Sequence, residues 1–480
     1  MKYTVKNTVK NTVKNTVKNT VIGLFAVAAL FISTGCTSSS STSNGGDVYT
    51  TSIQPILDAK CASCHGGSKT DAGLNLTSWD NLIKGSAFGE AIIAFDSENS
   101  VLVEMATKLQ PGPHPSAQSG SQLSTAELTT IRNWIDAGAK GPAGLAPFSG
   151  NREFVYVTNQ GEATINVIDV VDNVVARRVD LTKLGFDLGS KPHHVAVEPD
   201  GSFWYATLIS AGVILKFNRN NEIVGQSTFE VPGLLSMDPS SSMMYVGRSM
   251  AAVNPPTRIG MINRETMAID EAEVFIPRPH ALAVSKDGSM VYTASLSENK
   301  TIALDVVNDE PHMGDIEGPI HTVVDVEVSP DGKTMVGTTQ LTGKLYFFDA
   351  TDKVNMPIVD IVDVNEAPWH PIFSRDGSKV YFANKTTQTV TIVDVASRKV
   401  EVVIEGEGLA QPHGAALSAD GKTLYVSGNN LNAAYNARNN FGEEAKHPGT
   451  VAVIDLTTNK VVKVLEVGLY ASGAAGRPSW

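Results

Sequence analysis

At 480 residues, the chain is long enough for two or three domains. Its composition, 42% hydrophobic and 18% charged, is that of a folded globular protein rather than a disordered or membrane-embedded one. The first 35 residues hold five lysines and no acidic residue, so the remainder has 33 basic against 50 acidic residues, a charge near −17. So acidic a chain disfavours binding to nucleic acid or to anionic lipid surfaces.

Residues 1–35 have the pattern of an export signal. Four TVKN repeats make a lysine-rich start, and the apolar run VIGLFAVAALFI follows, which is too short for a transmembrane helix. The run ends in STGC, which resembles a bacterial lipobox and implies a lipid on Cys36. Lipoboxes prefer Leu where this chain has Ser33, so a plain secretory signal stays open. Both alternatives predict an exported protein in the periplasm or at the cell surface, with residues 36–46 as a flexible linker.

The strongest motif is Cys61-Ala-Ser-Cys64-His65, the haem c attachment pattern. Two thiols at this spacing can form thioethers to one haem, and the adjacent histidine can bind its iron. A zinc site would need further paired ligands, and a dithiol redox site would need a βαβ context. The motif therefore predicts one covalent haem c.

Residues 47–142 are predicted to form a small all-α cytochrome c domain. A helix is expected before Cys61, and a second one is expected after the capping box at Ser124 and Glu127. The frame of CxxCHGG, GLNL and LSTAELTTIRNWIDAGA resembles cytochrome c domains that are fused to other exported modules. The Met-Pro-Pro of that family is replaced by a stretch containing His114, so we favour His114 as the sixth iron ligand. Met105, expected in the core, and an open five-coordinate iron remain alternatives.

Residues 150–480 repeat one unit every 40 to 60 residues, which predicts an all-β propeller. Each unit has an apolar strand, a turn that usually carries Asp-Gly, a strand with an aromatic residue, and a third strand that ends near Asp. The repeated aspartates are expected to form turns rather than to catalyse. The first unit lacks its first strand, and YASGAA near the C-terminus is expected to supply it, so we predict seven blades. Tyr156-Val-Thr-Asn159 resembles the signature of YVTN-family propellers.

Blade geometry places most of the propeller's histidines at one mouth of the channel. First strands line the channel, and six histidines lie where these strands begin, with a seventh in a loop on the same face. They are His193, His194, His280, His321, His370, His413 and His447. Local capping of the backbone would explain one or two of them. Imidazole also binds copper, zinc and iron, so the alternative is a metal or anionic-ligand site. Strand alternation predicts that His193 and His194 do not point the same way.

Two enzyme families resemble parts of this arrangement. Cytochrome cd1 nitrite reductase joins haem c to a propeller that holds a second haem on histidines, but it has eight blades. The propeller of nitrous oxide reductase has seven, and its histidines, an adjacent pair among them, hold a copper cluster; Lys191-Pro-His-His194 looks like a fragment of its motifs. These resemblances imply a periplasmic oxidoreductase in which haem c exchanges electrons with a propeller metal, copper or another, or with a second haem. A redox partner protein and a small-molecule substrate are expected with it. The alternative is a non-catalytic electron-transfer cytochrome whose propeller docks a partner or binds a ligand.

Overall fold

The computed structural model describes residues 47–109, 112–116, 119, 121–249, 256–438 and 447–478. The predicted signal and the lipidation site at Cys36 lie outside these residues. Among the described residues, no helix is both long and apolar enough to cross a membrane.

Residues 47–142 are mainly helical, as predicted. A π-helical turn η1 (Tyr49–Ile53) leads into α1 (Gln54–Lys60), which ends just before Cys61. The other elements are β1 (His65–Gly66), β2 (Lys69–Thr70), η2 (Asp71–Gly73), α2 (Trp79–Ile83), α3 (Val101–Thr107) and α4 (Thr125–Asp136). The predicted capping box is present at the start of α4. Ile131, Trp134 and Ile135 of α4 are buried in the core of this region, and Leu128 packs against it.

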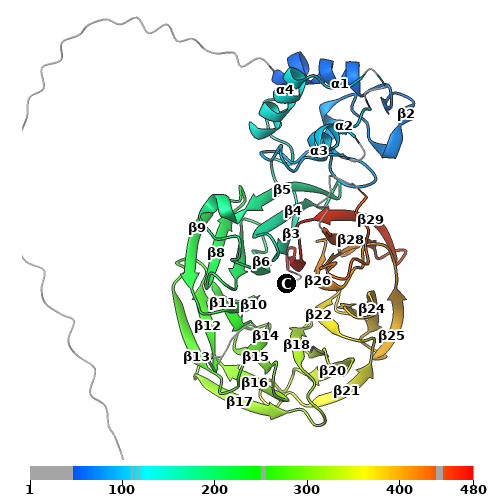
Figure 1. The fold of residues 1–480 in the computed structure, drawn as a ribbon. Coiled ribbons are helices and arrows are strands. Elements are labelled where there is room, and N and C mark those ends of the chain that lie inside the picture. Colours follow the sequence, from blue (N-terminus) through cyan, green and yellow to red (C-terminus); the bar gives the residue numbers. More distant parts are fainter. Residues whose placement is uncertain are drawn as a thin grey trace, which may run out of the picture. The chain divides into compact units, whose positions relative to one another are not determined.

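The remaining strands form seven four-stranded antiparallel sheets, which confirms the predicted seven-bladed propeller (Figure 1). Blade 1 consists of β30 (Ala471–Ala475), β3 (Phe154–Asn159), β4 (Thr164–Asp169) and β5 (Val174–Asp180). A short 3-10 turn, η4 (Leu181–Leu184), follows β5. The C-terminal strand β30 pairs with β3 and so completes the first blade, as the missing strand predicted.

The other six blades follow in chain order from the channel outward. Blade 2 is β6 (Pro192–Val197), β7 (Phe203–Leu208), β8 (Val213–Asn218) and β9 (Ile223–Thr228); blade 3 is β10 (Pro232–Met237), β11 (Met243–Arg248), β12 (Arg258–Asn263) and β13 (Ile269–Glu273). Blade 4 is β14 (Pro279–Val284), β15 (Met290–Ser295), β16 (Lys300–Asp305) and β17 (Glu310–Asp315); blade 5 is β18 (Val323–Val328), β19 (Thr334–Thr339), β20 (Lys344–Asp349) and β21 (Ile358–Asp363). Blade 6 is β22 (Pro368–Phe373), β23 (Lys379–Asn384), β24 (Thr389–Asp394) and β25 (Lys399–Ile404); blade 7 is β26 (Pro412–Leu417), β27 (Thr423–Gly428), β28 (Gly449–Asp455) and β29 (Lys460–Val467).

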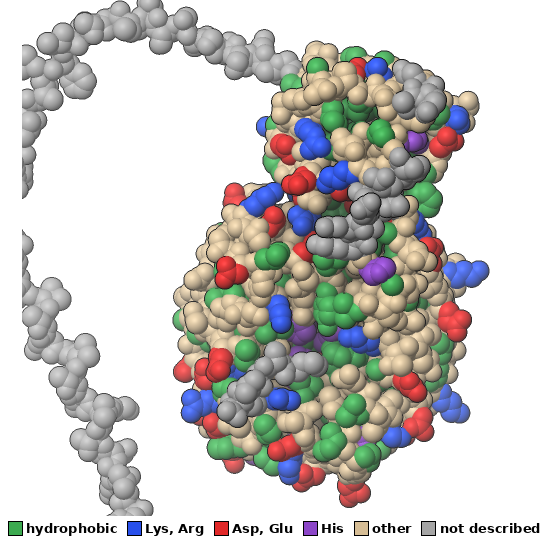
Figure 2. All heavy atoms as spheres, in the orientation of Figure 1, with side chains coloured by type: hydrophobic (Ala, Val, Ile, Leu, Met, Phe, Trp, Pro, Cys, Tyr) green, Lys and Arg blue, Asp and Glu red, His purple; other side chains and the backbone are tan. Residues whose placement is uncertain are grey.

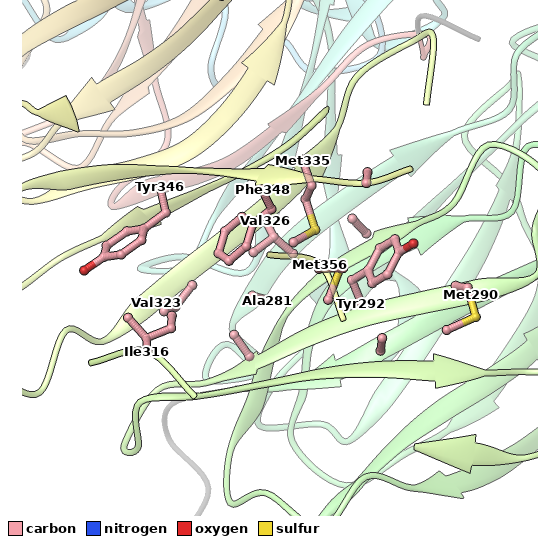
Figure 3. Close-up of a cluster of buried hydrophobic side chains, with 14 residues drawn as sticks. Ala281, Met290, Tyr292, Ile316, Val323, Val326, Met335, Tyr346, Phe348 and Met356 are labelled. Atoms are coloured by element: carbon pink, nitrogen blue, oxygen red, sulfur yellow. The ribbon is translucent and has the colours of Figure 1, made fainter. Parts of the chain in front are cut away.

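The hydrophobic core of the propeller lies between neighbouring blades. Seven clusters of buried side chains each combine residues of two adjacent blades. Figure 3 shows the cluster between blades 4 and 5, where Tyr292 of β15 and Met335 of β19 belong to one core. Because each blade buries apolar side chains on both faces, the ring of blades is stabilised as a whole.

The turns confirm the predicted hairpins but are longer than the expected two-residue turn. After β6, the N–H of Glu198 donates to the carbonyl of Phe203, so residues 199–202 form a four-residue loop. Gly201 in this loop has φ +69°, a conformation that glycine adopts without strain. The aspartates that end the third strands form turns, as predicted: Asp394, for example, accepts a hydrogen bond from the N–H of Ser397.

Every innermost strand is irregular near the residue with which it begins. In blade 2, the pairing of β6 with β7 shifts register between Pro192 and Val195. The same shift occurs in the other six blades. A bulge at this position changes the direction in which the intervening side chains point. It therefore decides where the histidines of these strands lie.

Candidate functional site

The residues of the haem motif have the chemistry that a covalent haem requires. The thiols of Cys61 and Cys64 are both free of disulfides, and burial raises the pKa of Cys61 to about 11. The Nδ1 atom of His65 is buried and has no partner in the described residues. A covalently attached haem would form thioethers with both thiols, and the His65 ring would bind its iron, which supplies one-electron chemistry. These three residues therefore fit haem c.

The ring of His114 lies near that of His65, with the ring centroids 6.1 Å apart. Metal–imidazole bonds are about 2 Å long and a ring nitrogen lies about 1 Å from its ring centre, so two rings that bound one iron would have centroids up to about 6 Å apart. The spacing therefore suits the favoured bis-histidine pair. Met105 lies on α3 with a half-buried side chain outside the buried core, and its carbonyl accepts a hydrogen bond from the N–H of His114. Burial and the nearby His65 lower the pKa of His114.

Five of the seven predicted propeller histidines meet in the channel. The ring of His193 lies 5.9 Å from that of His280 and 6.0 Å from that of His413. His370 lies 5.1 Å from His413 and 6.0 Å from His194. We call these five residues the channel histidines. Histidine side chains gather near the middle of the propeller face that Figure 2 shows.

His193 and His194 both join this cluster, although alternation along a strand had suggested opposite directions. The register shift between Pro192 and Val195 is the physical reason, because alternation holds only where the ladder is regular. Their roles nevertheless differ. His193 contacts two other channel histidines, whereas His194 accepts a hydrogen bond at Nδ1 from the N–H of Leu235.

His321 and His447 do not join the cluster. Both ring nitrogens of His321 have partners, Thr342 Oγ1 at 2.8 Å and the carbonyl of Glu317 at 2.9 Å, and the ring packs on Tyr346. Its role is therefore structural, and it is not a candidate ligand. His447 is exposed ahead of β28, and within the described part of the chain its ring contacts no other histidine.

Four channel histidines are almost completely buried, and each has a ring nitrogen without a hydrogen-bond partner in the described residues. These nitrogens are Nε2 of His193, His280 and His370 and Nδ1 of His413. These four residues are at most 7% exposed. A buried polar atom without a partner costs about 1–3 kcal/mol, so four such atoms in one place need an explanation.

Burial disfavours the charged form of four channel histidines. Burial lowers the pKa of His194 to about 3 and that of His280 to about 4. Burial and the neighbouring histidines also hold the pKa values of His193 and His413 well below the ordinary value. Uncharged imidazoles keep a lone pair on one ring nitrogen, which is the form that binds metal ions.

The backbone of His370 is strained. Its φ is +30°, in the left-handed region that residues with a side chain rarely adopt. Such strain costs about 1–3 kcal/mol and is concentrated at functional sites in proteins.

Trp369 and Lys385 lie beside the cluster: the Trp369 ring is 4.2 Å from that of His413, and the Lys385 ammonium is 4.9 Å from the Trp369 ring.

A cavity of about 190 Å³ extends along the channel next to the cluster. His194, His370, Asp325 and Glu327 contribute to its walls, together with the backbone of the innermost strands. Sequence reasoning missed both acidic residues, which lie in the first strand of the blade 5 repeat, because other blades have no acidic residue at these positions that would mark them as a set. Burial, with Asp325 nearby, raises the pKa of Glu327 to about 8. In the described ranges, no group of three or more His, Cys, Asp or Glu side chains is arranged as a preformed metal site.

Comparisons with known proteins agree with both parts of the fold. The Planctomycete cytochrome C family matches residues 61–113. A functionally unknown protein from Desulfotomaculum acetoxidans has a similar structure, with a TM-score of 0.52 at 15% identity over 68% of this chain and 98% of that one. Hydrazine synthase from Kuenenia stuttgartiensis gives a TM-score of 0.48 at 18% identity, over 59% of this chain and 89% of that one. Apo AztD from Citrobacter koseri gives 0.46 at 11% identity, over 68% and 98%.

At these identities the structural likenesses concern the fold alone. No curated protein sequence matches this chain. The family match covers the haem motif and ends one residue before His114. The chain thus carries a c-type cytochrome domain of the planctomycete family, which implies haem-based electron transfer, followed by a seven-bladed β-propeller.

Proposed function

We propose that this chain is an exported oxidoreductase in which haem c exchanges electrons with a metal centre held by histidines in the propeller channel. The observation that carries the haem part is the CxxCH motif within a matched cytochrome family. The metal part is supported by four buried ring nitrogens without partners, which lie in one cluster beside a cavity. Borderline transition metals such as copper and zinc are the ions that imidazole prefers.

The setting of this function is also a proposal. Export through the N-terminal signal, with a lipid on Cys36, would hold the protein at a bacterial membrane, in the periplasm or at the cell surface. A redox partner protein would exchange electrons with the haem, and a small substrate would enter the channel cavity.

Metal analysis of haem-loaded protein tests the proposal. After treatment with a chelator, the protein is dialysed against Cu²⁺ or Zn²⁺, and iron and the added metal are counted per chain. We expect one iron and one further metal, with copper reduced when the haem is reduced. Iron alone, at one per chain, would contradict the proposed oxidoreductase. The alternative, an electron-transfer cytochrome whose propeller docks a partner, would then remain.

The haem ligands can be read from spectra of the same preparation. His114→Ala should change the absorption spectrum of the low-spin haem, because its ring lies 6.1 Å from that of His65. Met105→Ala is the matched control and should leave the spectrum unchanged. The opposite result would make Met105 the sixth ligand, and two unchanged spectra would indicate a five-coordinate iron.

A further inference from the structure

Two channel histidines have a fixed acceptor behind the ring. His280 Nδ1 lies 2.7 Å from the backbone carbonyl of Arg248, and His370 Nδ1 lies 2.9 Å from Asp325 Oδ2. A carbonyl or carboxylate oxygen only accepts, so both rings must carry the proton on Nδ1. Their Nε2 atoms are buried and have no partner in the described chain, and in the neutral form of each ring Nε2 carries the lone pair. A lone pair attracts a cation and repels an anion.

His194 has the opposite arrangement. Its Nδ1 lies 3.1 Å from the N–H of Leu235, which can only donate, so the proton of the neutral ring is on Nε2. This ring therefore presents a donor to its surroundings. His193 Nδ1 lies 2.8 Å from Nε2 of Gln160, which only donates, so in this orientation His193 Nδ1 accepts. Turning the Gln160 amide over would place its oxygen there and leave the lone pair on Nε2 of His193.

The spacing of the rings suits a shared ion. Metal–nitrogen bonds are about 2 Å long and a ring nitrogen lies about 1 Å from its ring centre, so rings on one ion have centroids about 5 to 6 Å apart. Three contacts among His193, His280, His370 and His413 span 5.1 to 6.0 Å. Binding thus requires the rings to turn their nitrogens toward a common point.

We propose that the channel binds one transition-metal ion through Nε2 of His280 and His370, with His193 and His413 completing the imidazole set. Asp325 and the Arg248 carbonyl are the groups that hold the first two rings in the metal-binding tautomer, as acceptors commonly do behind metal-bound histidines. His194 is not a ligand, although the sequence places it beside one. This inference rests on the proposed propeller metal and assigns its ligands.

Copper binding to haem-loaded protein distinguishes these roles. Chelator-treated protein is titrated with Cu²⁺, and the affinity and the nitrogen couplings of the copper are measured by electron paramagnetic resonance. His280→Ala and His370→Ala should each weaken binding at least 100-fold and lose one coupled imidazole. His194→Ala, the adjacent control, should bind copper with unchanged affinity and the wild-type couplings. Circular dichroism and the haem spectrum identify variants that fail to fold.

Asp325→Asn tests the positioning role without removing a ligand. An amide can donate to His370 as well as accept from it, so the tautomer is no longer fixed. We expect 10- to 100-fold weaker copper binding with an unchanged unfolding temperature of the metal-free protein. If a histidine variant does not fold, this variant still tests the orienting contact of His370.

The outcomes separate this inference from the proposed function. If copper binds to wild type but is lost in His194→Ala and retained in His280→Ala, the ligand assignment is wrong while the metal centre stands. If copper binds with the assigned ligands but its oxidation state does not change when the haem is reduced, the ligand assignment stands and the proposed oxidoreductase function is wrong. If wild type binds no metal, both fail.

Discussion

His321 and His280 are each no more than 2% exposed. His280 lies at the start of innermost strand β14, and His321 lies just before innermost strand β18. Their hydrogen bonds separate them. His321 has a partner on each ring nitrogen, whereas His280 has one on Nδ1 alone. Burial by itself therefore does not single out a candidate ligand; a buried imidazole nitrogen without a partner, within a cluster of such rings, does. Thr342 and Arg248 lie 21 and 32 residues from the histidines that they contact, and the local partner Glu317 acts through its backbone carbonyl, so the sequence around each histidine could not show the difference.

The structural role of His321 predicts a loss of stability without a loss of metal. In His321→Ala, the carbonyl of Glu317 and the hydroxyl of Thr342 lose a partner, and the ring leaves a cavity beside Tyr346. We expect the free energy of unfolding to fall by about 2–4 kcal/mol. Urea unfolding of the haem-loaded protein measures this, and bound copper should stay at the wild-type amount.

His312→Ala is the matched control. His312 lies on the outermost strand β17 and is only half-buried, so its replacement should change the free energy of unfolding by no more than about 0.5 kcal/mol. If His321→Ala unfolded like His312→Ala but lost copper, His321 would belong to the metal site after all.

At the scale of strands, a buried hydroxyl on the second strand of three blades links the innermost strand of its own blade to that of the next blade. Thr158 of β3 accepts from the N–H of Gly473 in its own blade and donates to the carbonyl of His193 in blade 2 at 2.9 Å. Thr207 repeats the pattern from blade 2 to Gly233 in blade 3. Ser427 repeats it from blade 7 to Ser472, whose strand closes blade 1. The threonine of the YVTN signature thus fixes the backbone of a channel histidine.

Thr158→Val keeps the shape of the side chain and removes its hydroxyl. The carbonyl of His193 and the N–H of Gly473 then lose one partner, and each such loss costs about 1–3 kcal/mol where it leaves a buried group unpaired. We expect a lower unfolding temperature and weaker copper binding together, because His193 is one of the four imidazoles of the proposed site. Calorimetry and copper titration measure the two effects.

Thr158→Ser, which keeps the hydroxyl, should restore most of both properties. A Thr158→Val protein with wild-type stability would show that the hydroxyl is not a structural link between the blades.

Much of the element-level structure could be predicted, because it depends on local signals. The period of the repeats predicted seven blades, and the missing strand of the first repeat predicted that β30 completes blade 1. The capping box predicted where α4 begins. The bulge in each innermost strand could not be predicted, since it depends on pairing with a strand further along the chain. That bulge accounts for the presence of both His193 and His194 in one cluster, where they contact different rings. Asp325 was missed for a similar reason: only the fold brings it to His370.

At the scale of the whole molecule, buried ionisable groups set how stability depends on pH. His193, His194, His280 and His413 have lowered pKa values in the folded chain, about 3 for His194 and about 4 for His280. The unfolded chain protonates these groups near pH 6.5, so acidification below that value favours unfolding until the folded groups titrate as well. Each contributes up to about 1.4 kcal/mol per pH unit.

Two buried carboxyls act in the opposite direction. Burial raises the pKa of Glu90 to about 7, and burial with Asp325 raises that of Glu327 to about 8. Unfolded glutamates lose their protons near pH 4.3, so the stability that these groups contribute below that pH is lost as the pH rises to 7 or 8. Between pH 4.5 and 6.5 the four histidines outweigh the two glutamates, and stability rises with pH. Above pH 6.5 only the glutamates still titrate, and stability falls.

The metal-free protein should therefore be most stable between about pH 6 and 7. Urea midpoints at pH 5, 6.5 and 8 test this, and we expect the midpoint at pH 6.5 to be the highest. Glu327→Gln removes the carboxyl with the higher pKa, so its midpoint should fall less between pH 6.5 and 8 than that of wild type. A wild-type midpoint that stays constant from pH 5 to 6.5 would mean that the channel histidines are not kept neutral by the fold. Their free nitrogens would then be exposed to protons from solvent, and the channel would lose its preference for a metal cation.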